Sequence, residues 1–158
     1  MKTKNFSISL LGLKLLISSS FVAAQTVQDR LLNIQHQWAS CQYATLDNDL
    51  KISCLEKAII NNENALKATP ASSELKVWLA INNSSLAGAK GGLGALSLVK
   101  KSKKLLEEVI KVNPEVLDGS AYTSLGSLYY QVPGWPIAFG SDKKAEAMLK
   151  KALAINPD

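Results

Sequence analysis

Hydrophobic residues recur at helical spacing along nearly the whole chain after Gln25, and no stretch keeps the alternation of apolar and polar positions that is typical of a strand. In the first such stretch the apolar residues step by four, three, four and three positions: Val27, Leu31, Ile34, Trp38 and Cys41. This spacing places them on one face of a helix.

Turn residues and helix breakers divide the rest of the chain into five further helices. Asp47 and its polar neighbours supply an N-cap for a second helix, which stops before Pro70 because the residue before a proline avoids helical geometry. Its predicted inward positions are Leu50, Cys54, Ala58, Ala65 and Leu66. The remaining helices are expected at about 73–87, 95–112, 120–131 and 142–155, with the glycines of 88–94 as the clearest break. The fold class is therefore all-α.

Three of the predicted helices end in matching phrases, and their prolines lie 44 and 43 residues apart: Thr69-Pro70, Asn113-Pro114 and Asn156-Pro157. Residues taken as small stand twelve and five positions before each proline, and larger ones four before: Ala58, Ser102, Ala145; Ala65, Val109, Ala152; Leu66, Ile110, Leu153. Small residues let a neighbouring helix approach closely, and the larger residue fills the seam. A single helix pair cannot bury its apolar face alone, so the pattern predicts an α-solenoid of about three stacked pairs.

The last repeat carries a family resemblance. Its first helix has Tyr122, Leu125, Gly126 and Tyr129, and its second has Ala145, Leu149, Ala152 and Pro157. This pattern resembles a tetratricopeptide repeat, expanded by an insertion at 131–141 beyond the usual length of about 34 residues. The insertion contains Pro133-Gly134-Trp135-Pro136, and together with the Asn-Pro-Asp ending it resembles the T-component family of TRAP-type transporters. The close match covers about residues 119–158.

The resemblance implies a periplasmic helical-repeat protein that docks the substrate-binding protein of a TRAP-type transporter. Similar inserted repeats also occur in eukaryotic microtubule-associated relatives. The motif therefore indicates the fold more specifically than the function.

The N-terminal segment has the features of an export signal. Lys2 and Lys4 precede an apolar run that ends at Ala24, with small residues at the cleavage positions. We therefore expect a signal peptide over 1–24 and a helical-repeat domain over 25–158, located in the periplasm without stable membrane insertion. The alternative is an N-terminal membrane anchor.

Composition and charge narrow the functional classes. A chain of 158 residues suits one domain. The formal charge of +5 is misleading, because after the first 24 residues 15 basic and 13 acidic residues remain. No nucleic-acid partner is expected, because the net charge of residues 25–158 is close to neutral. The only concentrated basic patch, Lys100, Lys101, Lys103 and Lys104, shares its helix with Glu107 and Glu108 and is predicted to be a solvated face.

Cys41 and Cys54 flank the turn at Asp47, so two antiparallel helices would bring them face to face. A disulfide is predicted, since export provides an oxidising compartment. The alternative is a reactive thiol with His36 as its base. His36 lies five residues from Cys41, which places the two on different helix faces.

No catalytic set emerges from the sequence. There is one histidine, no metal-ligand spacing and no Ser/His/Asp arrangement, so we expect neither an enzyme nor a metal or other cofactor. The glycines of 88–94 invite a phosphate-loop interpretation, but no strand precedes them and no Gly-Lys-Ser/Thr follows. A flexible connection between helices explains them better.

Two features are candidates for binding. A polar stripe on the fifth helix consists of Ser120, Thr123, Ser127 and Tyr130, and in tetratricopeptide arrays this stripe lines a ligand groove. Asn82, Asn83 and Ser85 are the counterparts one repeat earlier; the alternative is an ordinary wet face. The second feature is the inserted loop, which either packs the rings of Trp135 and Phe139 on the helices or offers them to a partner. Packing is favoured, but the loop is the first site candidate.

The sequence thus predicts an exported helical scaffold that binds a protein partner, by resemblance the substrate-binding protein of a TRAP-type transporter. One alternative is a small-molecule binder that uses a pocket between the glycine-rich segment and the Pro-Gly-Trp-Pro loop. An envelope-assembly scaffold is the other, and a homo-oligomer is compatible with each.

Overall fold

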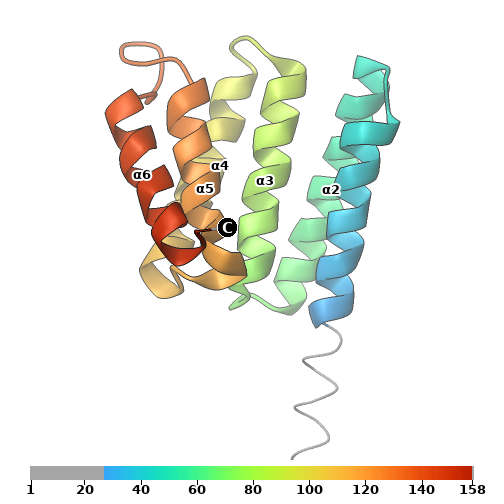
Figure 1. The fold of residues 1–158 in the computed structure, drawn as a ribbon. Helices are drawn as coiled ribbons and strands as arrows, with labels where there is room; N and C mark the ends of the chain where they lie inside the picture. The colour runs from blue at the N-terminus through green and yellow to red at the C-terminus, as the bar shows by residue number, and fades with distance from the viewer. Residues whose placement is uncertain (1–26, 158) are drawn as a thin grey trace, which may run out of the picture.

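The computed structural model describes residues 27–157, and this range is helical with no strand. The expected signal peptide over 1–24 lies outside the described residues. A helix over 27–39 runs directly into a π-helical turn, η1 (Ser40–Ala44). Five helices follow (Figure 1): α2 (Asn48–Ala68), α3 (Ser73–Lys90), α4 (Ala95–Val112), α5 (Val116–Gln131) and α6 (Asp142–Ile155). The all-α prediction is confirmed, and every helix predicted from the sequence is present.

Local capping chemistry sets most of the helix boundaries. The Asp47 side chain accepts a hydrogen bond from the Leu50 N–H at 2.8 Å, and Ser72 and Ser141 cap α3 and α6 in the same way. These caps satisfy N–H groups that have no partner within the helix. The helices that precede a proline end as predicted, with α2 stopping at Ala68 before Thr69-Pro70.

The start of α5 is irregular. Leu117, Asp118 and Gly119 all have positive φ angles of 50°, 54° and 76°, so a short left-handed turn precedes the regular helix. The regular part therefore begins at Ser120, where the sequence predicted it. Gly119 suits this turn because it has no Cβ, and an added Cβ would lie 3.1 Å from Ile155 Cδ1.

Consecutive helices pack side by side, with α3 in the middle of the array, in contact with α2, α4 and α5 (Figure 1). Val77 and Ala80 of α3 belong to a core that also takes buried residues from α4, α5 and α6. Leu79 and Leu86 point into a second core with Cys41 and with residues of α2. Buried residues of α3 thus belong to both cores, and Leu98 and Leu105 of α4 also pack against both.

The small residues of the sequence repeat lie where neighbouring helices approach, because Ala58, Ser102 and Ala145 are all buried. The larger residue of the last repeat was predicted wrongly. Leu153 is exposed, since no described element covers that side of α6. Leu50, predicted to point inward, is also exposed, because it lies in the first turn of α2 beside the surface connection 45–47.

A cluster of hydroxyl groups links α3 to α4. The Ser102 hydroxyl donates to the Ala80 carbonyl at 2.9 Å, the Ser84 hydroxyl donates to the same carbonyl at 2.9 Å, and the two hydroxyl oxygens are 2.7 Å apart. Ser102 is fully buried, and these bonds satisfy its hydroxyl group. The cluster fixes the register of α4 against α3.

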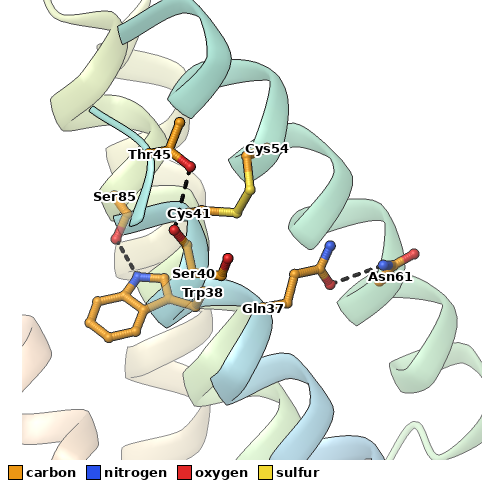
Figure 2. Close-up of a disulfide and its surroundings, with 8 residues drawn as sticks. All are labelled: Gln37, Trp38, Ser40, Cys41, Thr45, Cys54, Asn61 and Ser85. Atoms are coloured by element: carbon orange, nitrogen blue, oxygen red, sulfur yellow. Dashed lines mark hydrogen bonds between the residues drawn. A yellow bond between two sulfur atoms is a disulfide. The ribbon is translucent and has the colours of Figure 1, made fainter. Parts of the chain in front are cut away.

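The first helix is held to its neighbours by one covalent and two polar links (Figure 2). Cys41 and Cys54 form the predicted disulfide, with 5.5 Å between their Cα atoms. Asn61 Nδ2 donates to Gln37 Oε1 at 2.9 Å, and Trp38 Nε1 donates to Ser85 Oγ at 2.8 Å. The disulfide and the amide pair join the helix to α2, while the indole joins it to α3.

Replacing both Cys41 and Cys54 with alanine should lower the free energy of unfolding by about 3 kcal/mol. The disulfide joins residues 13 positions apart and so restricts the conformations of the unfolded chain. Chemical denaturation with and without a reductant measures the change. The double variant should be insensitive to the reductant. A wild-type protein whose stability does not fall on reduction would contradict this structural role.

Candidate functional site

Three connections meet at one end of the helical array: 45–47, 91–94 and 132–141 (Figure 1). Because consecutive helices run in opposite directions, every second connection returns to the same end. We refer to the end formed by these three segments as the loop end. It holds both the glycine-rich segment and the inserted Pro-Gly-Trp-Pro loop.

A cavity of about 420 Å³ lies at the loop end between these two segments. Its wall is formed by the last turns of α3, the first turns of α4, the end of α5 and the start of the inserted loop. Apolar side chains make up most of the lining: Leu93, Leu96, Val99, Leu128, Val132 and Ile137. The polar side chains on it are Ser84 and Gln131. A volume of this size is in the range of small-molecule sites, about 300–1,000 Å³. We refer to it as the loop-end cavity.

The inserted loop has a defined backbone structure. The N–H groups of Ile137 and Ala138 both donate to the Gly134 carbonyl at 3.1 Å, and the Gly140 N–H donates to the Pro133 carbonyl at 2.9 Å. The peptide bond between Trp135 and Pro136 is cis. Gly140 allows the two ends of the loop to touch, because a Cβ at this position would overlap the Val132 carbonyl.

The two aromatic rings of the loop have different environments. Phe139 is half-buried and meets Tyr129 edge to face, with 5.7 Å between the ring centroids. Trp135 is 90% exposed. The favoured prediction, packing of both rings on the helices, holds for Phe139 and is wrong for Trp135. The hydrogen bonds of the loop turn its tip away from the helices, and Trp135 sits at that tip.

A lysine of α4 reinforces the packed side of the loop. The Lys103 ammonium lies 5.7 Å from the centroid of the Phe139 ring and 2.6 Å from a carboxylate oxygen of Glu107. The hydrogen bond to Glu107 raises the pKa of Lys103, and the nearby Tyr129 acts in the same direction. The ammonium therefore stays charged, and its attraction to the ring helps to anchor Phe139.

The predicted polar stripe on α5 lies away from the loop-end cavity. The Ser120 and Ser127 hydroxyls donate to the Leu117 and Thr123 carbonyls, so both are engaged by the backbone nearby. Thr123 and Tyr130 are exposed. None of the four lines the cavity.

Asn82, Asn83 and Ser85 of α3 were predicted to line a groove as well. This prediction is wrong for the two asparagines. Asn82 and Asn83 are fully buried, because α3 is covered by helices on both sides. The Asn83 amide donates to the Leu79 carbonyl at 2.7 Å. Ser85 is half-buried and accepts the hydrogen bond from Trp38.

The sequence predicts a pocket between these two segments but not the residues that line it. Its pattern places Leu93 in a connection, Leu96 and Val99 in a helix and Ile137 in a loop, and does not indicate that they share a cavity. The available signal was the apolar character of residues beside glycine-rich and proline-rich segments. This signal is weak, because exposed apolar residues are common on protein surfaces.

The described residues contain no group of three or more His, Cys, Asp or Glu side chains placed to hold a metal ion. Within the same part of the chain no helix has the length and apolar character needed to cross a bilayer. Comparison of the chain with protein-family models and with curated proteins gives no match.

Replacing Gly140 with alanine should deform the inserted loop, because the new Cβ would overlap the backbone of Val132. We expect the free energy of unfolding to fall by about 1–3 kcal/mol. The amides of Gly140 and Ser141 should also exchange faster with solvent, since their hydrogen bonds to Pro133 and Tyr129 would be strained. Denaturation and hydrogen exchange measure the two effects.

Gly134→Ala is the matched control, since the nearest atom to its added Cβ is the Gly140 carbonyl oxygen at 3.5 Å, an ordinary contact. If both variants behave alike, the closure of the loop does not depend on Gly140.

Proposed function

We propose that this protein is an exported scaffold of stacked tetratricopeptide-like helix pairs that binds a protein partner through its loop end. Its role is recognition and not bond chemistry. The observation that carries the proposal is the exposure of large apolar side chains around the loop-end cavity. Trp135, Leu93 and Ile137 are 90%, 83% and 60% exposed.

Such exposure is costly for a protein in water, and grouped apolar side chains commonly mark an interaction site. Tryptophan in particular supplies a large share of binding energy at protein interfaces. The fixed backbone of the inserted loop favours binding further, because a side chain that is already positioned loses less entropy when a partner covers it.

The specific partner that we propose is the substrate-binding protein of a TRAP-type transporter, and the location is the periplasm. The support is the resemblance of residues 119–158 to the T-component family, together with the Pro-Gly-Trp-Pro sequence that forms the tip of the loop. The disulfide between Cys41 and Cys54 is compatible with export to an oxidising compartment.

Placing the photo-crosslinking residue p-benzoylphenylalanine at position 135 should yield a protein adduct in the cell envelope, which mass spectrometry can identify. The matched control carries the same residue in place of Leu153, which is exposed on α6 away from the loop end. In binding assays with the captured partner, Trp135→Ala should weaken affinity about tenfold or more.

An adduct that contains a solute-binding protein would support the transporter version. Equal crosslinking at both positions, or none at position 135, would contradict partner binding at the loop end.

A second function is favoured by a separate observation. The loop-end cavity has the volume and the apolar lining of a small-molecule site, so we propose small-molecule binding there as the alternative. Its position is between the glycine-rich segment and the inserted loop.

Gly88 provides the test of this alternative, because it lines the cavity and its added Cβ would meet no atom within 4 Å. Gly88→Phe should therefore fill the cavity without disturbing the fold. We expect the neutral probe 1-decanol to raise the melting temperature of the wild type and of Gly88→Ala, but not that of Gly88→Phe. Equal shifts in all three proteins would place the probe elsewhere.

A further inference from the structure

A second hollow, of about 440 Å³, adjoins the loop-end cavity across the last turns of α3. Ser84, Gly88 and Gln131 line both spaces. These three residues thus form a wall that the two spaces share. We refer to the second space as the polar hollow, because it is lined by amide, hydroxyl and ammonium groups: Gln42, Asn48, Lys51 and Ser85.

The two spaces differ sharply in chemistry. No charged side chain lines the loop-end cavity, and its wall is built from branched aliphatic groups such as those of Leu96 and Val99. The polar hollow offers hydrogen-bonding groups and one positive charge. A ligand that fills both must therefore be apolar at one end and polar at the other.

Lys51 decides the charge of the polar end. It is half-buried, and among residues 27–157 its ammonium forms no ion pair. The neighbouring Lys90 is paired with Glu56 at 2.7 Å. The Asp47 carboxylate beside it accepts the Leu50 N–H as the cap of α2, and Asp49 of the same turn is exposed to solvent. The polar hollow thus lacks a partner for its cation.

We infer that the two spaces form one site for an amphipathic carboxylate. The hydrocarbon chain occupies the loop-end cavity, and the carboxylate lies in the polar hollow. There it accepts hydrogen bonds from the Lys51 ammonium and from side-chain amides such as that of Gln42. This inference rests on the second proposed function, small-molecule binding at the loop end, and adds the chemical class of the ligand.

Gly88 lies on the wall that the two spaces share, and the inferred site requires a passage beside it. It stands in the last turns of α3, it lines both spaces, and no atom lies within 4 Å of the position where its Cβ would be. A larger side chain at this position would have open space beside the wall that the two spaces share, where the inferred ligand passes from one to the other.

Calorimetric titration with three probes of equal chain length tests the inference: decanoate, 1-decanol and decylamine, each kept monomeric. Decanoate should bind most tightly and decylamine most weakly. Lys51→Gln should weaken decanoate binding about three- to fivefold, as expected for a partly exposed ion pair, and leave 1-decanol binding unchanged. Lys104→Gln, which removes an exposed lysine of α4, should change neither.

The outcomes separate the inference from the function on which it rests. If 1-decanol and decanoate bind equally and Lys51→Gln has no effect, the carboxylate assignment is overturned while small-molecule binding in the cavity stands. If decylamine binds most tightly, the assignment is likewise overturned. If no probe binds, both fail. Decanoate binding that survives Gly88→Phe would place the site elsewhere and overturn the inference.

Discussion

Burial of α3 on two opposite sides is the constraint on which the rest of the structure depends. One side carries Val77 and Ala80 into the core shared with α4, α5 and α6, and the other carries Leu79 and Leu86 toward α2 and the disulfide. Polar groups of a helix covered on both sides have little access to water, so protein partners matter there. Among the described residues, Trp78 Nε1 and the side-chain oxygens of Asn82 and Asn83 are buried without a partner, whereas the Ser102 hydroxyl of α4 donates to the Ala80 carbonyl of α3. The neighbouring helices can shift little without breaking these contacts. The connections between helices are less restricted in their conformation.

The loop end follows from that constraint. Helices packed side by side in alternating directions bring the segments 91–94 and 132–141 to the same end, although some 40 residues separate them in the sequence (Figure 1). The inserted segment 132–141 is longer than a tight turn, and the space between the helix ends is filled incompletely. Apolar residues from each segment therefore surround a cavity. The polar hollow beside it arises in the same way, where α2 begins against the end of α3.

Features that depend on local chemistry were predictable from the sequence, and features that depend on a second layer of packing were not. The helix ends at Pro70 and Pro114 were predicted correctly, because proline acts on the residues next to it. The burial of Asn82 was missed, since a polar residue signals exposure unless both of its flanks are known to be covered. Helical spacing also could not separate Phe139 from Trp135. Their different environments depend on Tyr129 and Lys103, which belong to other elements.

The disulfide has a consequence for the maturation of the protein. Cys41 and Cys54 are the only cysteines in the sequence, so oxidation has a single intramolecular product. They lie on consecutive elements, 13 residues apart, so the contacts that bring them together are local in the sequence. An oxidant is therefore sufficient to complete the pairing. No mispaired intramolecular species has to be reshuffled by an isomerase before the N-terminal helices can pack.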